Sequence, residues 1–221
     1  MKSIRFSGVL ILCMASFSLF SQNWKFGVNF DPGLHWASVI NNNSELGNAG
    51  SRFGFNFDVL AERQFDYRYS FYIGISFMNT GFKFENLSDE NINFKTSNIL
   101  VLPPGQSGKI RAQYLASPFG IKLKTLEYGF LSYYFKAGLF PAVKLKGKIS
   151  LYDRKYDFSD DLKGITCGIQ LGAGGMYSMG DDTFLTGGLS FNYMFVDVMS
   201  SGPGGVKALP ISLGVSLGFL F

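Results

Sequence analysis

The chain has few of the residues on which metal sites and disulfide frameworks depend. Its 221 residues include two cysteines and one histidine. Cys13 lies in an amino-terminal segment that we expect to be removed, which leaves Cys167 alone and excludes an internal disulfide. The sequence also lacks Cys/His metal spacing, a phosphate-binding loop and a nucleophile elbow. We therefore expect no metal, no cofactor and no catalytic residue.

Charge is scarce as well. Charged residues make up 16% of the chain, below the roughly 25% of an average soluble domain. The formal charge is +4, and removing Lys2 and Arg5 would leave 18 basic and 16 acidic residues, a balance of +2. This balance gives no reason to expect a nucleic-acid partner. Aromatic residues reach 17%, with 27 glycines, which is typical of strands that contact lipid on one face and a crowded interior on the other.

Long apolar runs are absent after the first 21 residues. Residues 1–21 predict a secretory signal peptide, with an apolar region at 6–20 and cleavage at Ser21 and Gln22. About 15 apolar residues are too few for a spanning helix, which needs roughly 20. The mature domain, 22–221, would therefore either stay in the periplasm or insert as a β-barrel in the outer membrane of a Gram-negative bacterium.

Period-2 alternation is the main pattern that is present. Residues 211–221 place a large apolar side chain at every odd position and small residues at the even positions, with Leu220 the exception. This alternation is typical of a strand with one apolar and one polar face. Eight segments show it: 24–30, 52–63, 70–77, a fourth that ends at 124, 131–148, 164–174, 185–195 and 211–221.

The links between these segments alternate in length. Short links are expected at 64–69, 125–130 and 179–182, and long links at 32–51, 85–109, 150–163 and 197–206. Short turns at one end and long loops at the other are typical of outer-membrane barrels, whose turns face the periplasm. An even number of strands also brings both ends of the mature chain to the side of the turns.

The volume of the apolar side chains decides which face points inward. A soluble eight-stranded barrel of the lipocalin kind is the alternative fold, with its apolar side chains inside. An eight-stranded barrel is only just wide enough for side chains to fill, and the many Phe residues of the apolar face would not fit. The sequence therefore predicts an all-β fold, an up-and-down, eight-stranded antiparallel transmembrane β-barrel with its apolar face toward lipid.

Aromatic residues near the strand ends predict two girdles where rings would meet the lipid headgroups. Phe82 and Phe84 are expected at the outer rim. The other predicted girdle residues are Trp24, Trp36, Tyr133, Tyr193, Phe219 and Phe221.

Charged side chains on the polar face would line the lumen. Because buried charges must pair, we expect a structural network that fills the lumen, with an ion path through a small pore as the alternative. Lys25 and Glu62 lie at similar depth on adjacent segments and are the expected pair. The full set is Lys25, Arg52, Asp58, Glu62, Lys122, Lys124, Lys136 and Lys144.

Two further features concern the outer end. Lys144, Lys146 and Lys148 are expected to share one face, either as a contact for lipopolysaccharide phosphates or as a solvated rim. His35 lies near Asp31 and Ser38 in the sequence, and outer-membrane proteases and lipid A-modifying enzymes need a His beside a Ser or Asp. A lone His without a flanking motif is more typical of a loop or interface residue.

The mature chain resembles the small outer-membrane β-barrel proteins of Bacteroidetes that are often labelled PorT-like. The resemblance implies an eight-stranded outer-membrane barrel, and some relatives serve the type IX secretion and gliding apparatus. No catalytic residue carries over. The segments that carry it are Ser-Gln at 21–22, Trp-Lys-Phe-Gly-Val-Asn-Phe at 24–30, Gln-Tyr-Leu-Ala-Ser-Pro-Phe-Gly-Ile-Lys-Leu-Lys at 113–124, Tyr-Phe-Lys-Ala-Gly-Leu at 134–139 and the terminal Gly-Phe-Leu-Phe.

Taken together, the sequence favours a non-enzymatic envelope component. We expect it to present its loops or its lipid-facing strands to outer-membrane lipid, including lipopolysaccharide, or to a protein partner, as in a secretion complex. The barrel-assembly machinery is expected to recognise the terminal strand. An enzyme that uses His35 and a small pore are the two alternatives.

Overall fold

The computed structural model describes residues 24–40, 46–89, 92–93, 101–151, 154–180, 182–199 and 207–221. The predicted signal peptide, residues 1–21, and its cleavage site at Ser21 and Gln22 lie outside these residues. Within the described residues no helix is both long and apolar enough to cross a membrane.

Strands make up nearly all of the described chain, as the alternation predicts. Eleven of them form one sheet in which every pairing is antiparallel, while β5 and β6 pair only with each other. The all-β antiparallel prediction is therefore confirmed. The strands are β1 (Trp24–Ile40), β2 (Leu46–Gly50), β3 (Arg52–Asp66), β4 (Tyr69–Asn86), β5 (Ile92–Asn93), β6 (Val101–Leu102), β7 (Ser107–Ala116), β8 (Phe119–Lys124), β9 (Leu131–Leu151), β10 (Arg154–Asp157), β11 (Ile165–Gly180), β12 (Thr183–Met194) and β13 (Lys207–Leu220).

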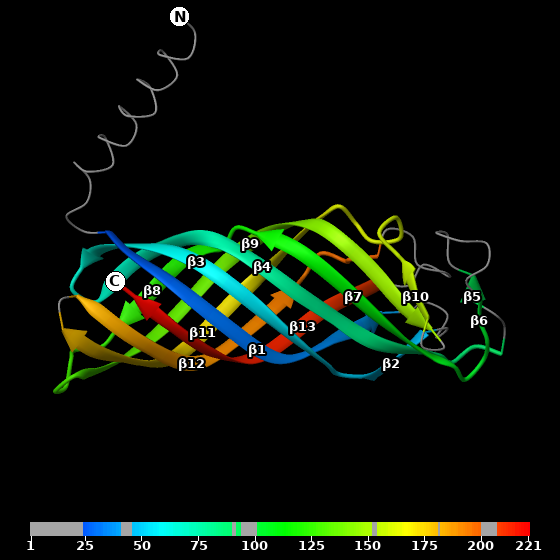
Figure 1. The fold of residues 1–221 in the computed structure, drawn as a ribbon, viewed down its shortest axis with the longest axis horizontal. Helices are drawn as coiled ribbons and strands as arrows, with labels where there is room; N and C mark the ends of the chain where they lie inside the picture. Colours follow the sequence, from blue (N-terminus) through cyan, green and yellow to red (C-terminus); the bar gives the residue numbers. More distant parts are fainter. Residues whose placement is uncertain are drawn as a thin grey trace, which may run out of the picture.

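The large sheet closes on itself. β1 pairs with β13 on one side and with β3 on the other, and β3 pairs with β4. β7 and β8 both pair with β4 and with β9, so they occupy the same place in the ring one after the other. From β9 the pairing returns through β11 and β12 to β13. Figure 1 shows these strands tilted around a common axis.

The strand boundaries differ from the predicted segments in two ways. The expected fourth segment is divided into β7 and β8 at Ser117 and Pro118, because proline has no backbone N–H to donate to the ladder. β1 runs further than expected, through Pro32 to Ile40, because the neighbouring strands continue beside it. β9 runs through Pro141 as predicted and ends three residues later than expected, at Leu151. The short strands β2 and β10 extend the sheet alongside β4 and β9.

The links give the barrel two different ends (Figure 1). At one end, called the turn end here, a two-residue turn joins β3 to β4, and β11 ends at Gly180 close to the start of β12 at Thr183. Phe26 and Phe221 exchange backbone hydrogen bonds of 2.6 and 2.7 Å at this same end. The opposite end, called the loop end, carries the links that connect β4 to β7, β10 to β11 and β12 to β13. The predicted alternation of short and long links is therefore present.

Outward positions carry the large apolar side chains. Along β4, for example, Ile73 and Ile75 are exposed while the alternating Tyr72 and Ser76 are buried. The same alternation places apolar groups outside on the other strands that form the ring. A continuous apolar outer surface of this kind is what a lipid-facing barrel requires.

The interior at the loop end is apolar, contrary to the expectation of a polar lumen throughout. Phe82 and Phe84, predicted in the outer girdle, are 3% and 2% exposed and belong to the apolar core cluster. Even-numbered residues of β4 face inward without interruption up to Asn86, so the two rings point into the barrel. Side chains from the loops complete this apolar plug: Leu102, Phe158, Leu162, Val198 and Met199.

The remaining predicted girdle residues lie near the two ends. Trp36 and Tyr193 both lie opposite Ile211 on adjacent strands, toward the loop end. Phe219 and Phe221 are exposed at the turn end, as is Tyr133. Trp24 begins β1 at the same end. Their contact with lipid headgroups stays a prediction.

Candidate functional site in the barrel interior

Five buried charged side chains fill the half of the interior nearer the turn end, and they are called the inner network here. Glu62 and Asp58 come from β3, Asp31 from β1, Lys122 from β8 and Lys136 from β9. Each occupies an inward position of the alternation, and Lys122 and Lys136 lie directly opposite each other. Of these five, the sequence prediction missed Asp31. It continues the inward series of β1, which was expected to end before Pro32.

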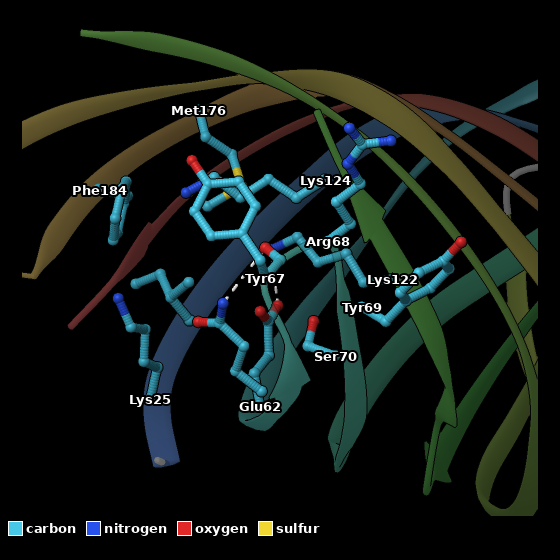
Figure 2. Close-up of a pocket in the computed structure, with 12 residues that line it drawn as sticks. Lys25, Glu62, Tyr67, Arg68, Tyr69, Ser70, Lys122, Lys124, Met176 and Phe184 are labelled. Atoms are coloured by element: carbon cyan, nitrogen blue, oxygen red, sulfur yellow. Dashed lines mark hydrogen bonds and ion pairs between the residues drawn. The ribbon is translucent and has the colours of Figure 1, made fainter. Parts of the chain in front are cut away.

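Lys122 and Glu62 form the central ion pair of the inner network. Lys122 Nζ lies 2.7 Å from Glu62 Oε1, and their side chains are only 7% and 11% exposed. The ammonium also lies 5.0 Å from the centre of the Tyr134 ring, within the range of a cation–π contact. Figure 2 shows the pair at the base of the opening at the turn end.

The expected pair between Lys25 and Glu62 is not formed. The two residues lie opposite each other in the β1–β3 register, but Lys25 Nζ instead contacts Asp182 Oδ1 at 2.8 Å and the Phe184 ring at 4.4 Å. Lys122 reaches Glu62 from the β8 side of the ring, so the carboxylate is already paired. Contacts across the lumen therefore decide the pairing, and sequence spacing does not reveal them.

Lys25 also affects the ionisation of the turn residue that it contacts. Its hydrogen bond and positive charge lower the pKa of Asp182 below the usual value. A lowered carboxyl pKa favours the folded state above the ordinary pKa, and that contribution is lost as the pH falls through the lowered value. Because the Asp182 side chain is 83% exposed, solvent screening keeps this contribution small.

Deeper in the barrel lies Lys136, whose charge attracts the carboxylates of Asp31 and Asp58 without a direct ion pair to either. The Ser76 hydroxyl donates a hydrogen bond to Asp58, and Ser190 and Ser216 lie beside Asp31. Small hydroxyl residues therefore surround the carboxylates, as expected for a crowded polar interior. This group is the predicted structural network of Asp58 and Lys136 with Asp31 added to it.

Two predicted network residues, Arg52 and Lys144, lie outside the inner network, toward the loop end. Arg52 donates a hydrogen bond of 3.1 Å to the Thr80 carbonyl oxygen toward the loop end. Lys144 Nζ donates to the carbonyl oxygens of Ser159 and Leu162, the latter at 2.6 Å, and so anchors the loop that fills the outer mouth. Both are structural contacts to backbone oxygen.

A register shift separates Lys144 from the two lysines that follow it. The pairing of β7 with β9 shifts between Gln113 and Tyr114, so that Lys146 lies opposite Gln113 and Lys144 lies opposite Tyr114. Lys144 therefore faces inward with the fully buried Tyr114, whereas Lys146 faces outward. The prediction that Lys144, Lys146 and Lys148 share one face is wrong because a bulge changes which face each residue takes.

His35 is inside the barrel and not on an accessible rim. It is 2% exposed, and its Nδ1 lies 2.9 Å from Thr80 Oγ1. Ser38 is exposed on the opposite face of β1. Asp31 shares the inward face with His35 but precedes it by four residues along the strand. The structure does not bring these three side chains together as a nucleophile, a base and an orienting acid.

Two small cavities lie in the interior near the turn end. A cavity of about 30 Å³ opens at the turn end, lined by Lys25, Lys122 and Lys124 among others (Figure 2). A second one, of about 20 Å³, lies beside Tyr72 and Lys136. Each has room for one or two water molecules. Among the described residues no group of three or more His, Cys, Asp or Glu side chains is placed to hold a metal ion.

Removing Lys122 would leave Glu62 buried without its partner. We expect Lys122→Met to destabilise the barrel by about 3–5 kcal/mol, and Lys122→Met with Glu62→Leu to recover most of this loss. The free energy of unfolding can be measured from Trp fluorescence during urea titration of the refolded protein in detergent micelles.

The matched control for this pair is Lys25→Met, which removes an ion pair at the exposed rim. It is expected to cost less than about 1 kcal/mol, because Asp182 remains solvated. An equal loss of stability for Lys25→Met and Lys122→Met would show that the inner pair has no special structural role.

Comparisons with known proteins agree with this architecture. A family model described as "Outer membrane protein beta-barrel domain" matches residues 20–200. No curated protein matches the chain. The chain is similar to the outer membrane protease OmpT of Escherichia coli, with a TM-score of 0.50 and 8% identity over 90% of this chain and 96% of that one.

Two other outer-membrane proteins show lower structural similarity. The outer membrane protein OprG of Pseudomonas aeruginosa gives a TM-score of 0.47 and 9% identity over 90% of this chain and 95% of that one. Neisserial surface protein A gives a TM-score of 0.43 and 12% identity over 88% of this chain and 96% of that one. Because the family model covers most of the chain, and because the structure is a closed antiparallel barrel with an apolar outer face, the chain belongs to the outer membrane protein β-barrel domain family.

Proposed function

We propose that this protein is an eight-stranded transmembrane barrel with a closed interior, which acts as a non-enzymatic binding component of the outer membrane. The ring of strand pairings has eight places, which supports an eight-stranded barrel. It passes through β1, β3, β4, the shared place of β7 and β8, β9, β11, β12 and β13. β2 and β10 are short additions at the loop end and do not add places to the ring.

The difference between the two ends supports an orientation in the membrane. Short turns of barrels in this membrane face the periplasm and long loops face outward, so we place the turn end in the periplasm. Export by a signal peptide at residues 1–21, followed by insertion of domain 22–221, is consistent with this orientation. Recognition of β13 by the barrel-assembly machinery fits its regular outward series of Leu213, Val215, Leu217 and Phe219.

The filled interior is the observation that carries the functional proposal. Buried charged side chains, with the Lys122–Glu62 ion pair among them, occupy the half near the turn end, and the apolar plug occupies the half near the loop end. The two cavities near the turn end hold only about 30 and 20 Å³. A barrel without a lumen to use must act through its loops and its outer surface, which favours partner or lipid binding over transport.

An enzymatic role is the weaker alternative. The likeness to the E. coli outer membrane protease is one of fold, at 8% identity. His35, on which such a role would depend, is buried and bonded to Thr80. Both side chains are buried, which gives them no access to a substrate.

The PorT-like resemblance supports a more specific assignment within the same proposal. Residues 113–124 and 134–139 carry it, and they form parts of β7, β8 and β9. We infer a Bacteroidetes origin and an accessory role in a type IX secretion or gliding complex. In that role the loops, or the lipid-facing strands, would contact a protein partner.

The closed interior predicts no steady current when the purified barrel is inserted in planar lipid bilayers, because ions would have to displace packed side chains. The control is a general porin measured in the same lipid. A steady conductance that changes in Lys136→Ala or Glu62→Ala, but not in Lys207→Ala at the outer end of β13, would contradict the proposal and favour a pore.

The burial of His35 predicts that His35→Ala leaves peptide hydrolysis and lipid A modification by reconstituted protein at the background level of the unaltered barrel. Activity is measured with fluorogenic peptides and by mass spectrometry of lipid A. Folding of each variant is checked by its resistance to SDS before boiling. Full loss of a clear activity in a folded His35→Ala variant would overturn the non-enzymatic assignment.

A binding role predicts that the tagged protein, purified in mild detergent from its native outer membrane, carries a protein partner in near-equal amount. Mass spectrometry identifies the partner, and its identity tests the secretion assignment. A preparation that contains the barrel alone would argue against a stable complex.

A further inference from the structure

Five basic side chains gather on the outer face of the barrel near the loop end, and they are called the outer basic patch here. They are Lys83 on β4, Lys109 and Arg111 on β7, and Lys146 and Lys148 on β9. These strands are neighbours in the ring, with Lys83 opposite Lys109 and Arg111 opposite Lys148. The patch is therefore one continuous surface on three adjacent strands.

Alternation places all five side chains outside. On β7 the alternating residues Ile110, Ala112 and Tyr114 are buried in the apolar plug. Arg111 lies between them in sequence and points away from the interior. On β9, Gly147 and Ile149 are buried, so Lys146 and Lys148 take the outward positions beyond the bulge.

The patch begins where the apolar outer surface stops. Phe77, Leu115 and Val143 lie opposite one another on β4, β7 and β9 and form an outward apolar row. The next outward position along β7 is Gln113, opposite Lys146, and the one after it is Arg111. Two residues of a strand span about 6.8 Å, so the first cations lie within one or two such steps of the last apolar row.

A cavity lies within the patch. It measures about 210 Å³, far more than the two interior cavities, and Arg111, Gln113, Lys146 and Lys148 line it. Its lining therefore contains three cations and an amide, with no carboxylate. Three donors of this type around one open space suit a phosphate group, because the Arg guanidinium and the ammonium groups form charge-assisted hydrogen bonds with its oxygens.

Two acidic side chains of the neighbouring strands lie beside the patch. Asp157 on β10 lies opposite Lys148 and is attracted by Lys146, while its Oδ1 accepts hydrogen bonds from the Ser159 backbone N–H at 2.9 Å and hydroxyl at 2.7 Å. Glu85 takes the next outward position after Lys83 on β4. Five cations against these two carboxylates leave the patch with a net positive charge. The ion pairs of the described chain, Lys25–Asp182, Lys122–Glu62 and Lys163–Asp197, all lie elsewhere. Arg52 lies close enough to Arg111 for mutual repulsion, which adds to the positive potential.

We propose that the outer basic patch binds the phosphate groups of a phosphorylated glycolipid headgroup in the outer leaflet. The acyl chains would lie along the apolar row of Phe77, Leu115 and Val143 while the cavity holds a phosphate. This inference rests on the membrane placement given under the proposed function. A lipid is favoured over free phosphate because the site adjoins a lipid-facing apolar surface.

The test uses the complete mature barrel, refolded in a neutral detergent, with diphosphoryl lipid A as the probe and native mass spectrometry as the readout. The variant carries Arg111→Gln and Lys148→Gln. Each lost charge-assisted contact should weaken binding about tenfold, so the double variant should bind at least tenfold more weakly than the unaltered barrel.

A matched control removes the same charge elsewhere. Arg68→Gln with Lys207→Gln changes one residue in the β3–β4 turn and one at the outer end of β13, on the opposite side of the ring from the patch. This control is expected to bind lipid A like the unaltered barrel. Resistance to SDS before boiling shows that each variant is folded.

Three outcomes would overturn the inference: equal binding by the patch and control variants, equal binding of lipid A from which the phosphates have been removed, or full displacement of the lipid by millimolar inorganic phosphate. The last result would identify a free-phosphate site. None of them concerns the closed lumen or His35, so the failure of this inference is distinguishable from the failure of the proposed function.

Discussion

The closed antiparallel ladder is the constraint on which the rest of this structure depends. Once the strands pair around the full ring, each residue must point either into a narrow interior or out to the surroundings. Only closure satisfies the backbone hydrogen-bonding groups of a sheet that faces lipid. The alternation of large apolar and small or charged residues follows from this two-sided geometry. So does the need to fill the interior, since a narrow barrel lined by unpaired charges would not be stable.

The interior meets this need in two different ways. Near the turn end, where the barrel opens to solvent, the filling groups are charged, with the Lys122–Glu62 ion pair at the centre and Lys136 attracting Asp31 and Asp58 electrostatically. Near the loop end, apolar side chains from the strands meet others from the loops. Lys144 fixes one of these loops, because its ammonium donates hydrogen bonds to the carbonyl oxygens of Ser159 and Leu162 in the outer mouth.

Because side chains fill the lumen, the outer surface of the barrel is where binding is expected. The outer surface is not uniform, because apolar rows on β4, β7 and β9 give way to a group of cations at one side of the ring. A stretch of sheet that is apolar at one level and basic at the next matches the layers of a lipid leaflet. The loops offer a second surface for partners.

The sequence by itself determined the fold class and the direction of nearly every strand residue, because a period of two is a local property. It identified the outward apolar face, the alternation of turns and loops, and the inward positions of Asp58, Glu62, Lys122 and Lys136. Only the tertiary structure decided which inward charges meet. Glu62 pairs with Lys122, which lies beyond the intervening strand β4, and not with Lys25 on the adjacent strand, since the curvature of the sheet lets inward side chains of non-adjacent strands converge.

Tertiary structure also decided where the alternation is interrupted and which face some aromatic residues take. A single register shift between β7 and β9 turns Lys146 and Lys148 outward, while Lys144 keeps the inward direction that the alternation gives it. Phe82 and Phe84 look like girdle residues by composition, yet the unbroken ladder of β4 places them in the core. Loop residues such as Phe158 fill the mouth, which no strand pattern can foresee. In each case the outcome depends on contacts between residues far apart in the chain, and a period of two carries no information about them.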